Sequence, residues 1–184
     1  MAEVIVLAAD GFETVECLTV IDVLRRGGVD VALVSINDTP EVESSQKVAV
    51  SCDCTLDEAD TASAEHLVLP GGKLGVANLR ADERVCGLVR EFMAEKQVDA
   101  ICAAPSILAE LGLLEGRRAT CFPGFDADFP EGVFAGERTV TIDGNLITAS
   151  GMALSLPFAL AILYKIAGRE AVARVKEGVQ LPEA

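Results

Sequence analysis

The chain contains a single histidine, His66, no tryptophan and one tyrosine. This scarcity excludes a metal site built on several histidines, and any Ser-His-Asp or Cys-His catalytic pair would have to use His66. That residue stands between Glu65 and Leu67, directly before an apolar run. We therefore expect His66 to cap a strand or to face solvent.

Basic residues are also scarce, because 15 lysines and arginines are outnumbered by 29 aspartates and glutamates, and the formal net charge is −14. Sequence-independent binding to nucleic acid requires cationic side chains that displace counterions from the phosphates. Anionic membrane surfaces likewise attract basic segments. The charge balance therefore argues against both nucleic acid and membranes as partners.

Long apolar runs are missing as well. The longest stretch near the C-terminal end, 156–163, contains Pro157 and is far shorter than the ~20 residues that span a bilayer. The first residues carry Glu3 and a short apolar run before Asp10, unlike the basic start and long apolar core of a signal peptide. We expect a cytoplasmic protein whose six cysteines are reduced thiols.

Apolar residues, in contrast, make up 51% of the chain, which excludes intrinsic disorder and supplies a large core. A length of 184 residues suits a single domain, 1–184. Apolar runs alternate with helical patterns from end to end, and no repeat or linker interrupts them. This alternation predicts an α/β sandwich in which helices cover both faces of a mostly parallel sheet.

The expected strands are 3–9, 29–34, 48–54, 67–69, 99–103, 133–142 and 146–149, and the expected helices are 13–26, 82–95, 105–111, 155–167 and 169–178. The pair Asp143-Gly144 predicts a tight hairpin between the last two strands. Functional sites of open parallel sheets form at the carboxyl ends of the strands. Two of these strand ends carry unusual residues.

The first is the junction at Cys102, which is followed by Ala103, Ala104 and Pro105. Small residues at a strand–helix junction allow a sharp turn that lifts the side chain out of the sheet, as in the nucleophile elbow of hydrolases. The N-terminus of the following helix would favour the thiolate and lower the pKa of Cys102. The pattern predicts a nucleophile or a redox-sensitive thiol, and a small buried core residue is the alternative.

The second is the pair Gly71-Gly72 after the strand 67–69. Paired glycines let the backbone approach another group closely, and their N–H groups can bind an anion. One such N–H, together with that of Ala103, would form an oxyanion hole beside Cys102. A plain tight turn is the other interpretation.

Glu13 and Glu16 open the first helix three residues apart. Acids there stabilise the helix dipole by ~0.3–1 kcal/mol, or one of them leans over the sheet end towards Cys102. A carboxylate beside a thiolate would repel it, so we expect the carboxyl group to be protonated and to donate a hydrogen bond to sulfur. Such a pair would pass a proton to or from a bound carbonyl compound. The spacing does not choose between the two glutamates.

Cys52 and Cys54 are expected in the core, because they alternate along the strand 48–54 with Val48 and Val50 on the same face. A C-x-C pair is also a possible start of a zinc site. No second pair of ligands follows at a suitable spacing.

Six stretches, taken together, resemble one family. They are G-F-E-x-x-E (11–16), D-V-L-R-R-G-G (22–28), L-P-G-G-x-L-G (69–75), I-C-A-A-P (101–105), T-C-F-P-G (120–124) and F-A-L-A-I (158–162). In this order they cover essentially the whole chain, which resembles the ThiJ/PfpI family in its branch of small cytosolic proteins related to the Parkinson-disease protein.

The resemblance implies a flavodoxin-like three-layer sandwich that forms a homodimer and uses neither a cofactor nor a metal. It implies that Cys102 is the reactive thiol and that Glu16 is the glutamate hydrogen-bonded to it. Gly72 and Ala103 match the backbone donors near the sulfur. Relatives are described as glyoxalases that convert methylglyoxal to lactate, as deglycases, and as oxidative-stress sensors or chaperones.

Gly71 and Phe122 would line the pocket of such a protein. Relatives often carry a histidine where Phe122 stands, and an arginine in the stretch that here reads Ala149-Ser150-Gly151-Met152. Gln46 also replaces a basic residue of some relatives. These differences argue against Cys-His protease chemistry and imply a pocket that is less basic than those of the relatives.

We therefore predict a cofactor-independent cysteine enzyme of glyoxalase or deglycase type. Its substrate would be a small carbonyl compound, a 2-oxoaldehyde such as methylglyoxal, with Cys102 as the nucleophile and Glu16 as the proton shuttle. The alternative is a non-catalytic oxidative-stress sensor or chaperone whose Cys102 oxidises to sulfinic acid.

Overall fold

The computed structural model describes residues 2–182 and is built on a seven-stranded sheet in the order β5-β2-β1-β6-β7-β9-β8. In chain order its strands are β1 (Val4–Ala8), β2 (Val31–Ser35), β5 (Cys54–Thr55), β6 (His66–Leu69), β7 (Gln97–Ile101), β8 (Val140–Asp143) and β9 (Leu146–Ala149). All neighbouring strands are parallel except β8 and β9. The predicted α/β fold with a mostly parallel sheet is confirmed.

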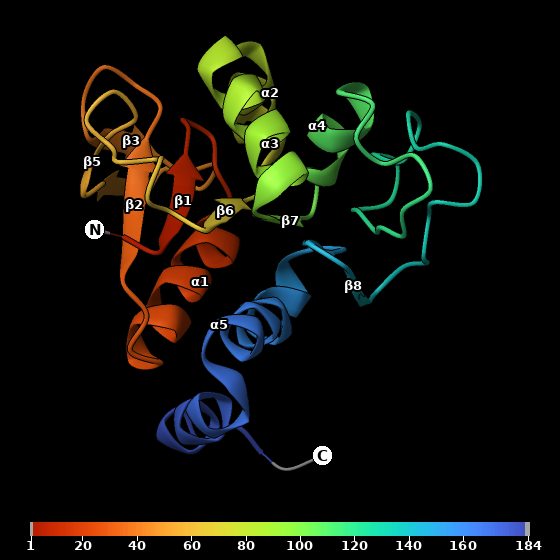
Figure 1. Cartoon of the computed structure of the whole chain (residues 1–184). Helices are drawn as coiled ribbons and strands as arrows, with labels where there is room; N and C mark the ends of the chain where they lie inside the picture. Colours follow the sequence, from red (N-terminus) through yellow and green to blue (C-terminus); the bar gives the residue numbers. More distant parts are fainter. Residues whose placement is uncertain (1, 183–184) are drawn as a thin grey trace.

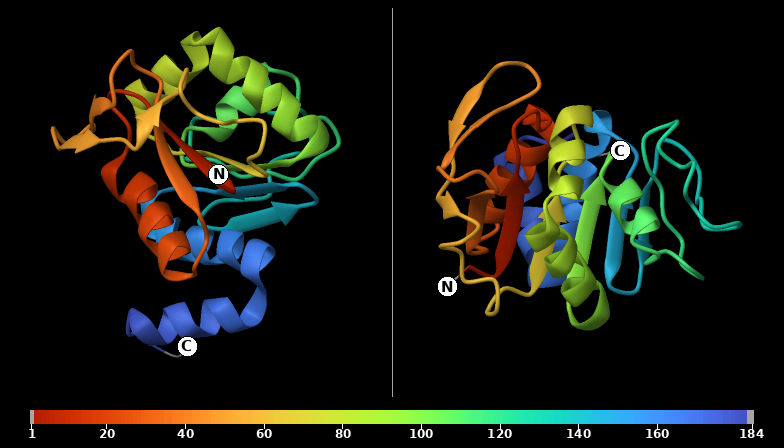
Figure 2. Two further views of the ribbon diagram at one scale, coloured as in Figure 1. Left: turned by 60° about the vertical axis from the view of Figure 1, so that its left-hand side comes forward. Right: turned by 90° about the horizontal axis from the view of Figure 1, so that it is seen from above.

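Helices cover both faces of this sheet (Figures 1 and 2). The helices are α1 (Thr14–Arg26) and α5 (Ser155–Gly178) on one face, and α2 (Lys73–Ala81), α3 (Glu83–Glu95) and α4 (Pro105–Glu110) on the other. The side chains of β1 alternate between the two layers, with Val6 packed towards α1 and α5 and Leu7 towards α3 and α4. A strand buried on both faces therefore appears in the sequence as a continuous apolar run.

The two predicted C-terminal helices are joined into α5, which follows a short 3-10 turn, η1 (Met152–Leu154). Gly168 has a non-helical backbone with φ 75°, so the chain kinks between the two expected helices. Together η1 and α5 are long and apolar enough to cross a membrane by length and composition alone. However, the first half is a core helix, because Phe158 and Ile162 are fully buried and α5 packs against α1.

Two strand predictions are wrong in extent. The expected strand 48–54 is instead split between β5 and a separate hairpin, β3 (Glu41–Glu43) and β4 (Ala49–Ser51). Val48, expected on the apolar face of that strand, is 45% exposed. The sequence pattern also missed α2, which begins directly after Gly72.

The second strand predicted with the wrong extent is 133–142, because β8 begins only at Val140. The chain from 111 to 139 is mostly turns and irregular structure beyond the β8 edge of the sheet (Figure 1). Its apolar residue Val133 is buried against the core, and Phe134 forms an isolated parallel bridge with Ala119. The apolar residues at the start of 133–142 therefore belong to a loop that packs on the core, and they resembled a strand for that reason. The hairpin between β8 and β9, in contrast, is present as predicted.

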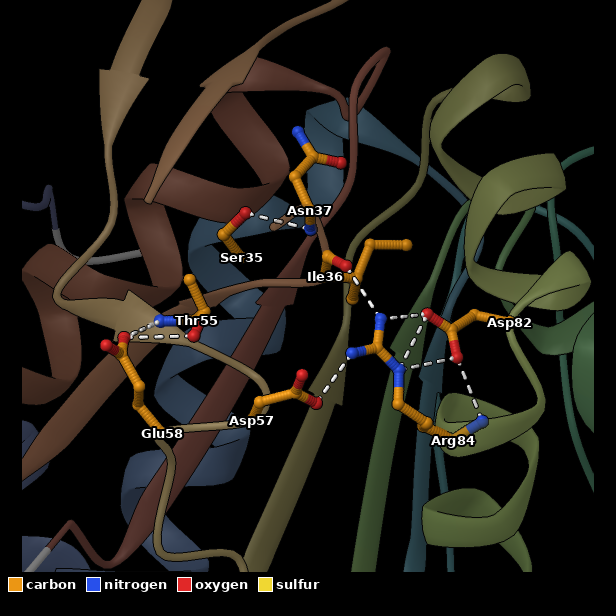
Figure 3. A network of polar contacts seen from close by, with 8 residues as sticks. All are labelled: Ser35, Ile36, Asn37, Thr55, Asp57, Glu58, Asp82 and Arg84. Atoms are coloured by element: carbon orange, nitrogen blue, oxygen red, sulfur yellow. Dashed lines mark hydrogen bonds and ion pairs between the residues drawn. The ribbon is translucent and has the colours of Figure 1, made fainter. Parts of the chain in front are cut away.

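Arg84 at the start of α3 ties three segments together at the carboxyl edge of the sheet (Figure 3). Its guanidinium donates to Asp82 at 2.6 Å, to Asp57 at 2.7 Å and to the carbonyl oxygen of Ile36 at 2.8 Å. Asp82 also accepts from the backbone N–H of Arg84 as the N-cap of α3. The network therefore fixes the helix start against the end of β2.

His66 lies in β6, where it is buried at the opposite, amino edge of the sheet. Its Nδ1 is 3.0 Å from Oδ2 of Asp99, which is 0% exposed, and Gln97 Nε2 donates to the other Asp99 oxygen at 2.7 Å. The expectation that His66 caps a strand or faces solvent is therefore wrong. His66 instead provides a hydrogen-bond partner for the buried Asp99 carboxylate on the neighbouring strand β7.

Replacing Asp99 by Ala should lower the free energy of unfolding by ~3 kcal/mol, because it leaves buried polar partners without the carboxylate. The control is Asp22→Ala, which removes the exposed pair between Asp22 and Arg26 on α1 and should change little. Urea unfolding of both variants measures the difference. Equal losses would contradict the structural role of Asp99.

Candidate active site

Cys102 occupies a sharp turn between β7 and α4. Its φ of 63° lies in the left-handed region, which costs a residue with a side chain roughly 1–3 kcal/mol. Two hydrogen bonds hold this turn: the N–H of Cys102 donates to the Ala149 carbonyl at 2.8 Å, and its carbonyl accepts from the Phe122 N–H at 2.8 Å. The strand end of β9 and the loop at Phe122 therefore fix the backbone of the cysteine.

Glu16, and not Glu13, points towards this cysteine. Glu13 is the N-cap of α1, and its Oε2 accepts from the backbone N–H of Glu16 at 2.7 Å. Glu16 is only 1% exposed, its Oε2 accepts from the Gly71 N–H at 2.9 Å, and its carboxyl group hydrogen-bonds the Cys102 thiol. The spacing did not distinguish the two acids, but in the structure Glu13 caps α1 and Glu16 contacts the sulfur.

Gly71 lies where the Glu16 and Cys102 side chains meet. A Cβ at this position would stand 2.6 Å from Cβ and 3.1 Å from Sγ of Cys102, and it would overlap Oε2 of Glu16. At Gly72, φ is 94° and a Cβ would stand 2.7 Å from the backbone nitrogen of Glu13. Neither position has room for a side chain.

Backbone amides surround the sulfur as well. The N–H groups of Gly72 and Ala103 hydrogen-bond Cys102. They come from two neighbouring parallel strand ends, after β6 and after β7. Donors in this arrangement favour negative charge on the sulfur or on an oxygen bound beside it.

Burial is the largest influence on both titrating groups. It raises the pKa of Glu16 to about 7; the hydrogen bond with Cys102 opposes the rise and the Glu13 charge adds to it. Burial, and after it the negative charge of Glu16, raise the pKa of Cys102 to about 12. The hydrogen bonds from the Gly72 and Ala103 amides lower this pKa by less. The expected lowering of the cysteine pKa is therefore wrong, because desolvation outweighs the donors at the start of the six-residue helix α4.

Between these two pKa values the pair of Glu16 and Cys102 carries one proton. Oε1 of Glu16 has no hydrogen-bond partner among the described residues. If the shared proton moves from Sγ to the Glu16 carboxyl group, a thiolate stands beside a neutral carboxyl group and the repulsion between them disappears. The pair is thereby able to present a thiolate without placing two negative charges in one buried site.

A hollow of about 520 Å³ lies beside the segment that follows β9. Its lining residues are Phe122, Pro123, Glu137, Arg138 and the segment 150–154. Cys102 does not line it, but the backbone N–H of its lining residue Phe122 donates to the Cys102 carbonyl. Glu137 and Arg138 were missed by sequence reasoning because they lie in the loop that was predicted to be a strand. Arg138 also supplies a basic group to this pocket, which the family resemblance predicted to be less basic than those of the relatives.

The described part of the chain, residues 2–182, contains no group of three or more His, Cys, Asp and Glu residues arranged to hold a metal ion. Cys52 is buried in the layer formed with α1, and Cys54 is half-buried in β5. Both therefore pack in or beside the core.

Residues 2–165 match the DJ-1/PfpI family, and the chain belongs to this family. Protein DJ-1 homolog B of Arabidopsis thaliana is 38% identical over 184 residues, which are 99% of this chain and 40% of that protein. The chain thus spans less than half the length of that relative.

Two further similarities cover most of both molecules. Deglycase PH1704 of Pyrococcus horikoshii is 31% identical over 149 residues, 80% of this chain and 89% of that protein. The solved structure of oxidized DJ-1 from Toxoplasma gondii matches with a TM-score of 0.93 at 27% identity, over 100% of both chains. The flavodoxin-like architecture is therefore that of DJ-1 proteins.

Replacing Gly71 by Ala should lower the free energy of unfolding by ~1–3 kcal/mol, because the new methyl group overpacks the contact between Glu16 and Cys102. The matched control is Gly87→Ala in α3, where an added Cβ meets nothing within 4 Å. That variant should gain stability by ~0.5–1 kcal/mol from helix propensity. Chemical denaturation measures the two changes, and the same sign for both would contradict the described packing.

The alkylation rate of Cys102 should rise with pH and level off above a pKa of about 7, that of Glu16. Below this pKa the pair gains a second proton, so the form with thiolate and neutral carboxyl becomes less populated. In Glu16→Gln no carboxyl titrates, and the inflection near this pH should vanish. Peptide mass spectrometry after timed iodoacetamide treatment follows the rate, and an unchanged inflection in the variant would exclude Glu16 as its source.

Proposed function

We propose that the protein is a cofactor-independent cysteine enzyme that converts 2-oxoaldehydes such as methylglyoxal to 2-hydroxy acids. The observation that carries the proposal is the buried Glu16, with a pKa of about 7 and one unpartnered oxygen, beside the Cys102 thiol. His66 lies at the other edge of the sheet, paired with Asp99. Glu16 is therefore the residue that performs acid–base chemistry at Cys102.

The reaction begins with attack of the Cys102 thiolate on the aldehyde carbon, which forms a C–S bond. The carbonyl oxygen becomes an oxyanion, which the amides of Gly72 and Ala103 stabilise, and it gains a proton to give a hemithioacetal. Glu16 then removes the proton from the former aldehyde carbon and returns one to the neighbouring ketone carbon, while the hydroxyl proton of the hemithioacetal passes to the ketone oxygen. The aldehyde carbon is thereby oxidised and the ketone carbon reduced within one molecule.

The product of this proton transfer is a thioester of the 2-hydroxy acid. Water hydrolyses it, releasing the acid and restoring the thiol, so the net reaction adds one water and needs no redox cofactor. Amines that have been glycated by a 2-oxoaldehyde carry the carbon skeleton of that 2-oxoaldehyde. Deglycase PH1704 is a relative named for deglycation, and this supports attack of Cys102 on such adducts as a related activity.

The proposal places the protein in the cytoplasm, as a single domain acting in a homodimer. Val15, Val48 and Leu74 are exposed apolar residues from α1, from the β3–β4 hairpin and from α2. These three segments are hydrogen-bonded together through Gly11 and Phe12. They form apolar surface that a second copy would cover.

A redox sensor is the second candidate. Cys102 is half-buried, whereas Cys17 and Cys121 are fully buried, and the donors around Cys102 would hold a sulfinate. Two equivalents of peroxide would oxidise the thiol to the sulfinic acid, each being reduced to water. The relative from Toxoplasma gondii was solved in an oxidized form.

Replacing Cys102 by Ser should reduce the formation of lactate from methylglyoxal at least ~100-fold, because the hydroxyl is a far weaker nucleophile than the thiolate. The control is Cys86→Ser, which changes a half-buried thiol on α3 and should keep the activity. Enzymatic detection of lactate measures both. Retained turnover in Cys102→Ser would falsify the mechanism, whereas absent turnover with selective peroxide oxidation of Cys102 would favour the sensor.

A further inference from the structure

Two residues that line the hollow, Phe122 and Ser150, lie next to the backbone of Cys102, which does not itself line it. The Ala149 carbonyl that holds the Cys102 N–H comes directly before Ser150, which lines the hollow. The Phe122 N–H that holds the Cys102 carbonyl belongs to a second lining residue. A carbonyl compound bound at the sulfur would therefore direct its substituent either towards the glycines or into this hollow. The glycine side is closely packed, since an added Cβ at Gly71 would already overlap Glu16.

The lining of this hollow is predominantly apolar. Phe122 and Met152 are exposed at 46% and 53%, and Ala153 is exposed beside them. The ring of Phe122 lies against Gly151, where a built Cβ would be 3.3 Å from the ring carbon Cδ2. Exposed apolar side chains gathered around a concave site favour an apolar ligand, which removes their surface from water.

Charge in the hollow does not favour an ionic ligand. Its charged residues are Glu137 and Arg138, neighbours of opposite sign that are both exposed. Their charges cancel. An anion attracted by Arg138 would thus also face the Glu137 carboxylate.

The volume is much larger than a methyl group requires. The hollow holds about 520 Å³, whereas a benzene-sized group fits a cavity of roughly 150 Å³. The methyl group of methylglyoxal would leave most of the lining in contact with water. A branched or cyclic hydrocarbon group would cover it.

We propose that this hollow is a substrate subsite for an apolar substituent, so that the protein prefers 2-oxoaldehydes with branched or cyclic alkyl groups to methylglyoxal. This inference rests on the proposed function, since it defines the substrate class of the same site. Phe122, Met152 and Ala153 are the residues that determine the preference. Cys102 and Glu16 perform the same steps for every substrate.

The first test compares kcat/KM for cyclohexylglyoxal and for methylglyoxal. We expect cyclohexylglyoxal to be preferred about tenfold or more, because added hydrocarbon in an apolar pocket changes kcat/KM by at least that factor. Ala153→Leu fills the hollow and should remove the preference, while Ala173→Leu, an exposed position on the last part of α5, should retain it. Turnover of methylglyoxal without any preference would overturn the subsite and leave the proposed function standing.

The second test needs no turnover. Cys102 is alkylated with iodoacetamide and with N-benzyliodoacetamide, and Cys86 in the same molecule serves as the reference thiol. We expect the benzyl reagent to be favoured about tenfold at Cys102 relative to Cys86, and Ala153→Leu to abolish this ratio. Equal ratios at the two cysteines, as a hollow covered by a second copy would give, overturn the subsite even if no 2-oxoaldehyde is converted.

Discussion

Removing the Glu16 carboxyl group from water costs free energy, and the surrounding site compensates for its burial. With 1% of its surface exposed, this group is stabilised by the Gly71 N–H at 2.9 Å and by the Cys102 thiol. The compensation requires a backbone that approaches both side chains closely, which only a glycine at position 71 permits. The same burial raises the pKa of Glu16 to about 7, so the carboxyl group is able both to take and to give a proton.

The backbone strain at Cys102 is maintained by the sheet. β7 lies between β6 and β9, so the residue after its end has a neighbouring strand end on each side. Hydrogen bonds with Ala149 and Phe122 hold the turn with its φ of 63°. A strained residue persists where its surroundings determine its conformation more strongly than its own preference does. The parallel order of the strands therefore positions the sulfur over the Gly72 and Ala103 amides.

Most elements were predictable where burial follows a regular period. The continuous apolar run of β1 and the pattern of α1 each reflect packing against the core. The prediction failed where irregular chain also packs on the core, as it does around Val133. The expectation for His66 also failed, because its buried partner Asp99 is adjacent to it only across the sheet, on the neighbouring strand. Local pattern carries no information about a partner on another strand.

The fold class, and the strand ends at which chemistry was expected, follow from local patterns of residues. Glycine pairs, small residues and acids at helix starts restrict the backbone locally, so Gly71, Cys102 and the two glutamates were recognisable from their positions. The tertiary structure decided that Glu16 meets the sulfur while Glu13 caps the helix. It also decided that burial raises the pKa of Cys102, because desolvation depends on residues from distant parts of the chain.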